Sequence, residues 1–115
     1  MIVYCYKNCG TCKKALKFLD ENKVEYEYKE IVEDIPTAEK LLKYMDLFDG
    51  PAKKFFNTSG MKYRELGMKD KIKDMDENAM AEILSTDGML IKRPLLVADG
   101  KILLGFKIDD WKEII

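Results

Sequence analysis

The chain opens with an apolar run, from Ile2 to Tyr6, whose length and β-rich composition predict a buried strand. A helix follows, because apolar residues from Cys12 to Leu19 recur at the i, i+3, i+4, i+7 spacing of one helical face, and Asn22 is a suitable stop. Apolar and charged residues then alternate over 24–29, which predicts a second strand. Two strands joined by a helix form a β-α-β unit, so we expect these strands to be parallel.

The middle of the chain, from Asp34 to Leu90, carries helical spacings and turn residues but no convincing strand pattern. Apolar residues recur at helical spacing in two stretches, at 41–48 and at 80–84. Asp74 or Asp76 can cap this second helix, and Gly88 stands where the residue just past its end belongs. We therefore predict a helical insertion over about 34–90.

The last quarter of the chain returns to strands. Leu95–Ala98 and Lys101–Leu104 flank Asp99-Gly100, a dipeptide favoured in type I′ hairpin turns, so we expect this pair to be antiparallel. Asp109 and Asp110 then open a short terminal helix. The order β-α-β, helices, β-β-α predicts an α/β chain with a thioredoxin-like fold and a helical insertion, in one domain over 1–115.

The amino-acid composition excludes several classes of catalysis and binding. The 115 residues carry 20 Lys plus Arg against 21 Asp plus Glu, and a net charge of -1 lacks the basic field on which nucleic-acid binding usually relies. There is no His and there are three Cys, which excludes Ser-His-Asp and Cys-His catalysis and a four-ligand Cys/His zinc site within the chain. We expect no metal and no direct nucleic-acid partner.

The N-terminus bears on location. The apolar stretch from Met1 to Tyr6 is far shorter than a signal-peptide core or a membrane span of about 20 residues, so we expect a cytoplasmic protein without a membrane partner. An odd number of cysteines in a reducing compartment indicates free, reactive or buried thiols. We expect the protein to be a monomer.

The motif Cys9-Gly10-Thr11-Cys12 lies between the first strand and the first helix. A thiol at a helix start faces unpaired N–H groups and the positive end of the helix dipole, which stabilise a thiolate, and Lys13 adds positive charge. We interpret Cys9 as the attacking thiol and Cys12, one turn later, as the resolving thiol. The alternatives are half of a zinc site completed by a partner chain, or two incidental thiols. Cys5, within the apolar run, is interpreted as core packing.

Arg93-Pro94 is the second candidate feature. A proline that opens a strand before a hairpin is a candidate for the cis form. Arg93 is either a solvated charge or an anion ligand beside the thiolate. Arg64, after the turn at Gly60, is either a surface charge or part of an anion pocket.

Three stretches resemble, in order, the arsenate reductase (ArsC) family, which includes the Spx/MgsR-type regulators. They are Asn8–Ala15, then Phe56–Thr58 with Gly60, Tyr63 and Leu66, and then Ile91–Leu96 with Leu104–Phe106. The resemblance implies a thioredoxin-like fold with a helical insertion. The family's Arg-Pro bond resembles the cis-proline turn that faces the active-site cysteine of thioredoxin-like proteins. It therefore implies a cis bond at Pro94.

The resemblance also implies an activity. In glutathione-dependent arsenate reductases a cysteine at the position of Cys9 attacks arsenate, and three arginines bind the oxyanion. Here only Arg93 matches, because Asn57 stands at the first arginine position and the third falls near Gly105 or Phe106; Arg64 or Lys107 can compensate. The candidate anion-binding residues are Gly10, Thr11, Lys13, Asn57 and Arg64. We expect no bound cofactor, and glutathione, another low-molecular-weight thiol or thioredoxin as the reductant.

A cysteine at the position of Cys12 resembles the Spx branch, in which a CxxC senses oxidation and the activity is contact with the C-terminal domain of the RNA polymerase α subunit. Asp49-Gly50 resembles the surroundings of the glycine that takes part in that contact. The leading hypothesis is therefore a thiol–disulfide oxidoreductase acting on an oxidised substrate. The alternatives are a redox-sensing regulator that binds RNA polymerase through a site including Gly50, and a thioredoxin-like fold with a structural role only.

Overall fold

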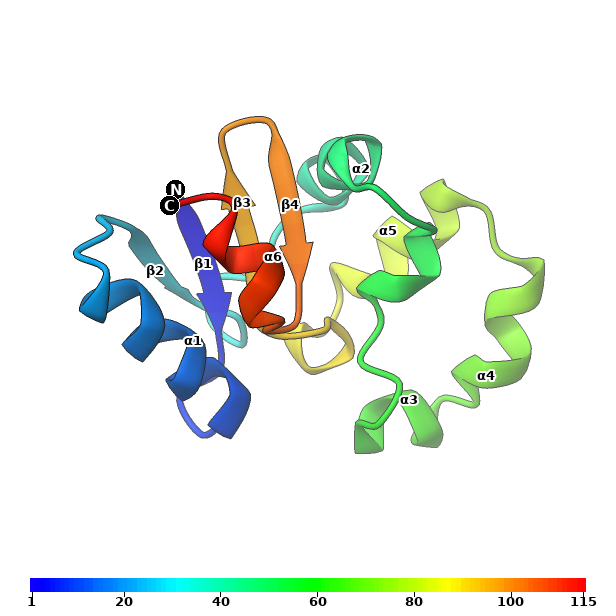
Figure 1. The fold of residues 1–115 in the computed structure, drawn as a ribbon. Coiled ribbons are helices and arrows are strands. Elements are labelled where there is room, and N and C mark those ends of the chain that lie inside the picture. The colour runs from blue at the N-terminus through cyan, green and yellow to red at the C-terminus, as the bar shows by residue number, and fades with distance from the viewer.

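A computed structural model describes the whole chain, residues 1–115, and shows one mixed sheet of four strands. The strands are β1 (Ile2–Cys5), β2 (Glu27–Glu30), β3 (Leu95–Ala98) and β4 (Lys101–Leu104). They lie in the order β2-β1-β3-β4, with β1 parallel to β2 and β3 antiparallel to both of its neighbours (Figure 1). The predicted parallel β-α-β unit and the antiparallel hairpin are therefore confirmed.

Two helices lie next to the sheet strands in the sequence, outside the insertion. Helix α1 (Gly10–Glu21) joins β1 to β2, and α6 (Ile108–Lys112) follows β4. Asn22 ends α1 as predicted, and its side-chain Nδ2 donates to the carbonyl of Phe18 at 2.8 Å. No helix in the structure has the length and apolar character required to cross a membrane.

The segment between β2 and β3 is helical, as predicted. Its elements are α2 (Ala38–Leu47), η1 (Ala52–Phe55), α3 (Met61–Glu65), α4 (Met68–Lys71), η2 (Ile72–Asp74), α5 (Glu77–Leu84) and η3 (Gly88–Leu90). Asp76 caps α5, because its carboxylate accepts a 2.8 Å hydrogen bond from the N–H of Ala79. Figure 1 shows this insertion extending beyond the β4 edge of the sheet.

The two faces of the sheet bury two different apolar clusters, since successive strand residues point to opposite sides. Val3, Leu96 and Leu103 pack with α1 and α6, including fully buried Trp111. Tyr4, Leu95 and Ile102 face the insertion and join the larger cluster there. The indole Nε1 of Trp111 donates to the carbonyl of Gly105 at 3.1 Å, which ties α6 to the end of β4.

The second strand and the hairpin turn differ in detail from the prediction. β2 begins at Glu27, not at 24, because Lys23 takes a left-handed conformation (φ 56°) after α1 and the chain needs residues to reach the sheet. Val24 and Tyr26 pack against the α1 cluster instead of pairing. Gly100 has φ 71°, but Asp99 is not among the residues with positive φ, which excludes a type I′ turn.

Gly88 does not end α5, as its position in the sequence suggested. The helix stops at Leu84, and Gly88 begins the short η3 turn, where it is buried. A Cβ on Gly88 would lie 2.1 Å from the carbonyl oxygen of Ile31. The glycine is therefore required by the close approach of two backbone segments and not by a helix cap.

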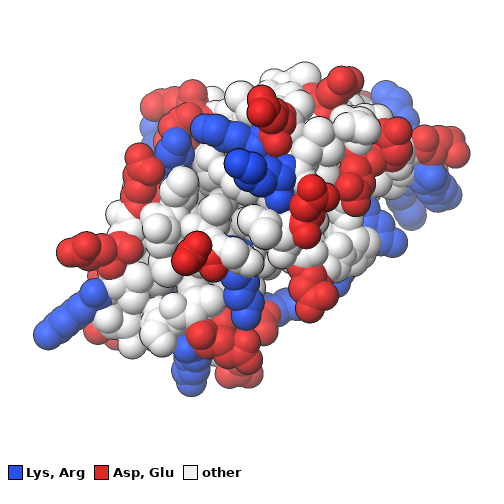
Figure 2. All heavy atoms as spheres, turned by 90° about the horizontal axis from the view of Figure 1, so that it is seen from above, with Lys and Arg blue, Asp and Glu red and all other residues white.

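Figure 2 shows the molecule from above, relative to Figure 1, and on this face acidic and basic side chains are interspersed. The near-equal numbers of the two signs in the sequence are thus mixed on this face and not separated into large areas of one sign.

Candidate functional site

The two cysteines of the CxxC motif lie at the start of α1 with different exposure. Cys9 is the N-cap residue, its N–H donates to the carbonyl of Tyr6 at 2.9 Å, and its side chain takes no part in capping. Cys9 is partly exposed, whereas Cys12 is only 1% exposed. A substrate can therefore reach Cys9 from solvent, whereas Cys12 is buried in the protein interior.

A third thiol adjoins the motif from the sheet. Cys5, at the end of β1, is fully buried as predicted, in the same cluster as Cys12, and all three cysteines are free. A hydrogen bond with Cys5 lowers the pKa of Cys12 to about 7, helped by the backbone of Tyr6, the Cys9 side chain and the charge of Arg93, and opposed by burial. The same hydrogen bond and burial raise the pKa of Cys5. Of these two buried thiols, Cys12 is therefore the one whose environment favours the thiolate.

Arg93 brings positive charge to these thiols. Its peptide bond to buried Pro94 is cis, as the resemblance implied. The guanidinium lies 5.4 Å from the centre of the Tyr6 ring. Its only hydrogen bonds are long, from Nη1 to the Ile91 carbonyl (3.5 Å) and to the Met89 sulfur (4.0 Å), and its buried Nε has no partner. Most of its donor capacity is therefore unused within the protein.

A cavity of about 580 Å³ opens in front of Cys9. Four predicted site residues line it: Cys9, Thr11, Asn57 and Arg93. Lys92 and Lys107 line it too, so the cavity carries three cationic side chains. From the sequence, Lys107 was only a possible substitute for a missing arginine, and Lys92 was not singled out, because a lysine next to Arg93 resembles an ordinary solvated charge.

The comparisons with known proteins agree with this geometry. The model of the ArsC family matches residues 4–114, which is nearly the whole chain. The chain belongs to the ArsC family. The resemblance of the three motif stretches is thereby confirmed.

Curated relatives fall into two groups. The chain is 47% identical to the uncharacterized protein YusI of Bacillus subtilis over 110 residues, which covers 96% of this chain and 93% of that protein. It is 21% identical to the global transcriptional regulator Spx 2 of Bacillus anthracis, covering 100% and 86%, and 25% identical to the regulatory protein MgsR of Bacillus subtilis, covering 90% and 80%.

Solved structures share the fold along its length. A crystal structure of an ArsC-family-related protein from Bacteroides fragilis superimposes with a TM-score of 0.95 at 43% identity, covering 99% of this chain and 96% of that one. The structure of a possible arsenate reductase from Streptococcus mutans gives a TM-score of 0.87 at 39% identity, covering 96% of each chain. The thioredoxin-like ArsC fold with its insertion is therefore established.

Several predicted site residues of this ArsC-family chain lie outside the cavity. Gly10 and Lys13 do not line it, and neither does Gly50, which follows α2 in the insertion. Arg64 is exposed, and its Nη2 donates to the carbonyl of Ser59 at 3.0 Å instead of facing the cavity. Asn57, at the position of the family's first arginine, does line the cavity and accepts a 3.3 Å hydrogen bond from the Ser59 hydroxyl.

No group of three or more His, Cys, Asp or Glu residues is arranged to hold a metal ion. The functional groups that the cavity offers are the Cys9 thiol, the hydroxyls of Thr11 and Ser59, the Asn57 amide, and the cations Lys92, Arg93 and Lys107. This set can attack an electrophilic sulfur or oxyanion and can bind an anion.

Proposed function

We propose that this ArsC-family protein is a thiol–disulfide oxidoreductase in which Cys9 and Cys12 cycle between dithiol and disulfide. One observation carries the proposal: an accessible cysteine at the N-cap position of α1 lines a cationic cavity, and a buried cysteine with a lowered pKa lies one helical turn further on. An exposed attacking thiol backed by a protected resolving thiol is the arrangement that such exchange needs.

The reaction proceeds in two exchanges. The Cys9 thiolate attacks one sulfur of an oxidised disulfide substrate, forms a mixed disulfide, and releases the other half as a thiolate that takes up a proton. Cys12 then attacks the Cys9 sulfur, expels the second half and closes the Cys9–Cys12 disulfide. The substrate gains two electrons and the protein loses two. Glutathione, another low-molecular-weight thiol or thioredoxin returns these electrons and restores both thiols.

Arg93 stabilises the Cys9 thiolate or an anion bound next to it. The unused donors of its guanidinium support this role. Arsenate is expected to be a poor substrate, because an oxyanion would meet one arginine and two lysines instead of three bidentate guanidinium groups. Lys13 and Arg64 are left with the weaker role of adding to the positive field around the cavity, and Gly10 contributes only its backbone N–H at the start of α1.

The test follows reduction of 2-hydroxyethyl disulfide by the purified protein in the presence of glutathione, with arsenate run alongside. Cys9→Ser should abolish turnover. Cys12→Ser should leave the first exchange intact and accumulate a mixed disulfide on Cys9, visible as an added mass. Full activity in Cys9→Ser together with loss in Cys12→Ser would show that the two roles are reversed, and full activity in both would refute the proposal.

A second candidate function is a redox-sensing regulator that binds the RNA polymerase α subunit. The regulators Spx 2 and MgsR, which align with most or all of the chain, favour it. The test is capture of the α C-terminal domain by the reduced and the oxidised protein. A Cβ on Gly50 would lie 2.8 Å from the Phe48 ring, so Gly50 variants also disturb the local structure. Exposed Asp49→Lys probes the same surface without that effect. Absence of the complex in both redox states would eliminate this candidate.

We further propose that the protein works in the cytoplasm as a monomeric domain. Its odd number of cysteines supports a reducing compartment, in which the resting form would be the dithiol.

A further inference from the structure

A second and larger hollow lies between β4 and the insertion. Its volume is about 1040 Å³, and we call it the lysine groove. Seven lysines line it against three carboxylates, and nearly half of its lining residues are hydrophobic, including Phe56 and Tyr63. Only one of the seven, Lys101, has a carboxylate within 4.0 Å, its partner being Glu113 at 3.4 Å. The groove is therefore an unneutralised cationic surface over an apolar floor.

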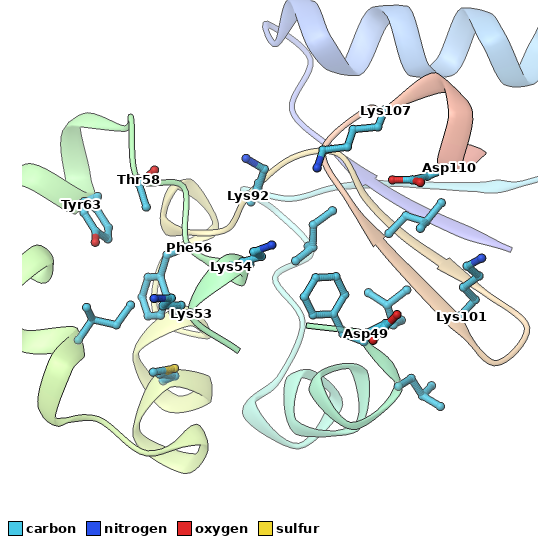
Figure 3. A pocket seen from close by; sticks show the side chains of 18 of the residues that line it. Asp49, Lys53, Lys54, Phe56, Thr58, Tyr63, Lys92, Lys101, Lys107 and Asp110 are labelled. Atoms are coloured by element: carbon cyan, nitrogen blue, oxygen red, sulfur yellow. The ribbon is translucent and has the colours of Figure 1, made fainter. Parts of the chain in front are cut away.

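The lysine groove adjoins the cavity in front of Cys9. Lys92, Leu104, Gly105 and Lys107 line both hollows, so the end of β4 is their common wall. In Figure 3, Lys54 from η1, Lys92 and Lys107 lie around the same part of the groove. A ligand that occupies the groove therefore lies next to the cavity that Cys9 lines.

The edge of the sheet forms one side of the groove. β4 is the last strand in the order β2-β1-β3-β4, and all four of its residues line the groove although their side chains alternate between the faces. The N–H of Gly105 donates to the Pro94 carbonyl at 2.9 Å, toward β3. Because backbone groups of successive residues in a strand point to opposite sides, the N–H and C=O of Leu104 point away from β3. Neither group has a hydrogen-bond partner in the protein, and Leu104 is partly exposed.

We propose that the lysine groove binds an extended acidic segment of a partner protein, which adds to the sheet edge at Leu104 and brings the partner's disulfide to Cys9. Three features favour a peptide over a small anion. The groove is larger than a pocket for one oxyanion requires. The lysines are spread along it from the insertion to the end of β4. Leu104 offers the paired donor and acceptor that an added strand uses.

This inference rests on the proposed function only for its last step, the exchange at Cys9. The binding step needs no thiol, so it can be tested with a probe that contains no cysteine. The probe is a fluorescein-labelled peptide of about six residues that alternates Glu with Leu, and the control peptide carries Lys in place of Glu. Fluorescence anisotropy with the full-length protein measures both.

The acidic peptide should bind and the basic peptide should not. The double variant Lys53→Glu/Lys54→Glu, which reverses two exposed charges in the groove, should weaken binding by about tenfold or more. The matched control is Lys17→Glu/Lys43→Glu, which changes the net charge equally at two exposed lysines outside the groove. It should stay within about twofold of the unmodified protein, since exposed charges at a distance are screened.

A second measurement addresses the strand edge. Hydrogen exchange of the Leu104 amide should slow when the acidic peptide is present, whereas Leu103, already paired with Leu96 of β3, should not change. Leu104→Pro removes the groove-facing N–H without removing a bond to β3, and should weaken binding more than Leu104→Ala.

Equal binding of the two peptides, equal loss in the groove and control variants, or an unchanged Leu104 amide would each overturn the proposal. So would binding of glutathione alone in the groove without binding of the peptide. Peptide binding in a protein that shows no thiol turnover would leave the groove assignment standing and remove the proposed function. Turnover of 2-hydroxyethyl disulfide without peptide binding would leave the proposed function standing and remove the groove assignment.

Discussion

Replacing Cys5 by alanine should raise the pKa of Cys12, although both residues of the CxxC motif stay in place. The hydrogen bond with Cys5 is the largest cause of the lowered Cys12 pKa, and burial of Cys12 opposes it. Alanine removes the donor but leaves the burial. Cys5→Ser is the matched control, because its hydroxyl keeps a donor of similar size at the same place.

The size of the effect follows from the strength of the lost bond. A hydrogen bond to a charged group contributes about 1.5 to 3 kcal/mol, and one pKa unit corresponds to about 1.4 kcal/mol. Cys5→Ala should therefore raise the Cys12 pKa by roughly 1 to 2 units, from about 7 to about 8 or 9. The thiolate fraction of Cys12 at neutral pH would fall accordingly, which slows the resolving exchange.

The assay is a pH titration of thiolate absorbance near 240 nm. It is best done in a Cys9→Ser background, where the serine hydroxyl preserves the contact with Cys12. The raised pKa of Cys5 keeps its own titration at higher pH. The upward shift should appear with Cys5→Ala and not with Cys5→Ser. The same Cys12 midpoint with and without the Cys5 thiol would refute the idea that Cys5 sets the charge state of the site.

Three further predictions concern stability and are checked by urea unfolding. Gly88→Ala should lower the free energy of unfolding by about 3 kcal/mol, because the new Cβ would clash with the Ile31 carbonyl. Gly10→Ala, whose Cβ would have nothing within 4 Å, should not destabilise the protein. Equal effects of the two substitutions would contradict the argument that Gly88 is required by a backbone contact. Asp76→Ala should cost about 1 kcal/mol by removing the cap of α5, and Asp74→Ala, which caps nothing, less than about 0.5 kcal/mol. Burial, with the Tyr44 hydrogen bond, raises the folded-state pKa of Tyr4, so the contribution of neutral Tyr4 to folding stability is complete below about pH 10 and falls above it. Tyr4→Phe should therefore reduce the loss of unfolding free energy at alkaline pH by up to about 1.4 kcal/mol per pH unit. The same dependence of unfolding free energy on pH in both proteins would exclude Tyr4 as the source of that loss.

Features that depend on neighbouring residues were predictable from the sequence. The helix ending at Asn22 and the hairpin around Asp99-Gly100 follow from spacing and turn residues, since each is stabilised by bonds within one short segment. The strand β1 was predictable from its apolar composition, although its pairing with β2 and β3 is long-range. The placement of Cys9 at a helix start follows in the same way.

Errors arose where a distant segment decided the outcome. Gly88 resembled a helix end, but the backbone of Ile31, far away in the sequence, is what requires it. Arg64 was open to two interpretations, a surface charge or part of an anion pocket, and in the structure its side chain donates to the nearby Ser59 carbonyl and does not line the cavity. In both cases the local pattern was compatible with two outcomes that only packing separates.

The sequence by itself determined the order of the elements, the absence of imidazole chemistry and the position of a CxxC motif between a strand and a helix. Only the tertiary structure decided which groups surround that motif. It placed Cys5 against Cys12, and Lys92 and Lys107 beside Cys9, and it left the edge of β4 open along a groove lined by lysines. The physical reason is that charge and hydrogen bonding act across space, between residues that the folded sheet and the insertion bring together from separate parts of the chain.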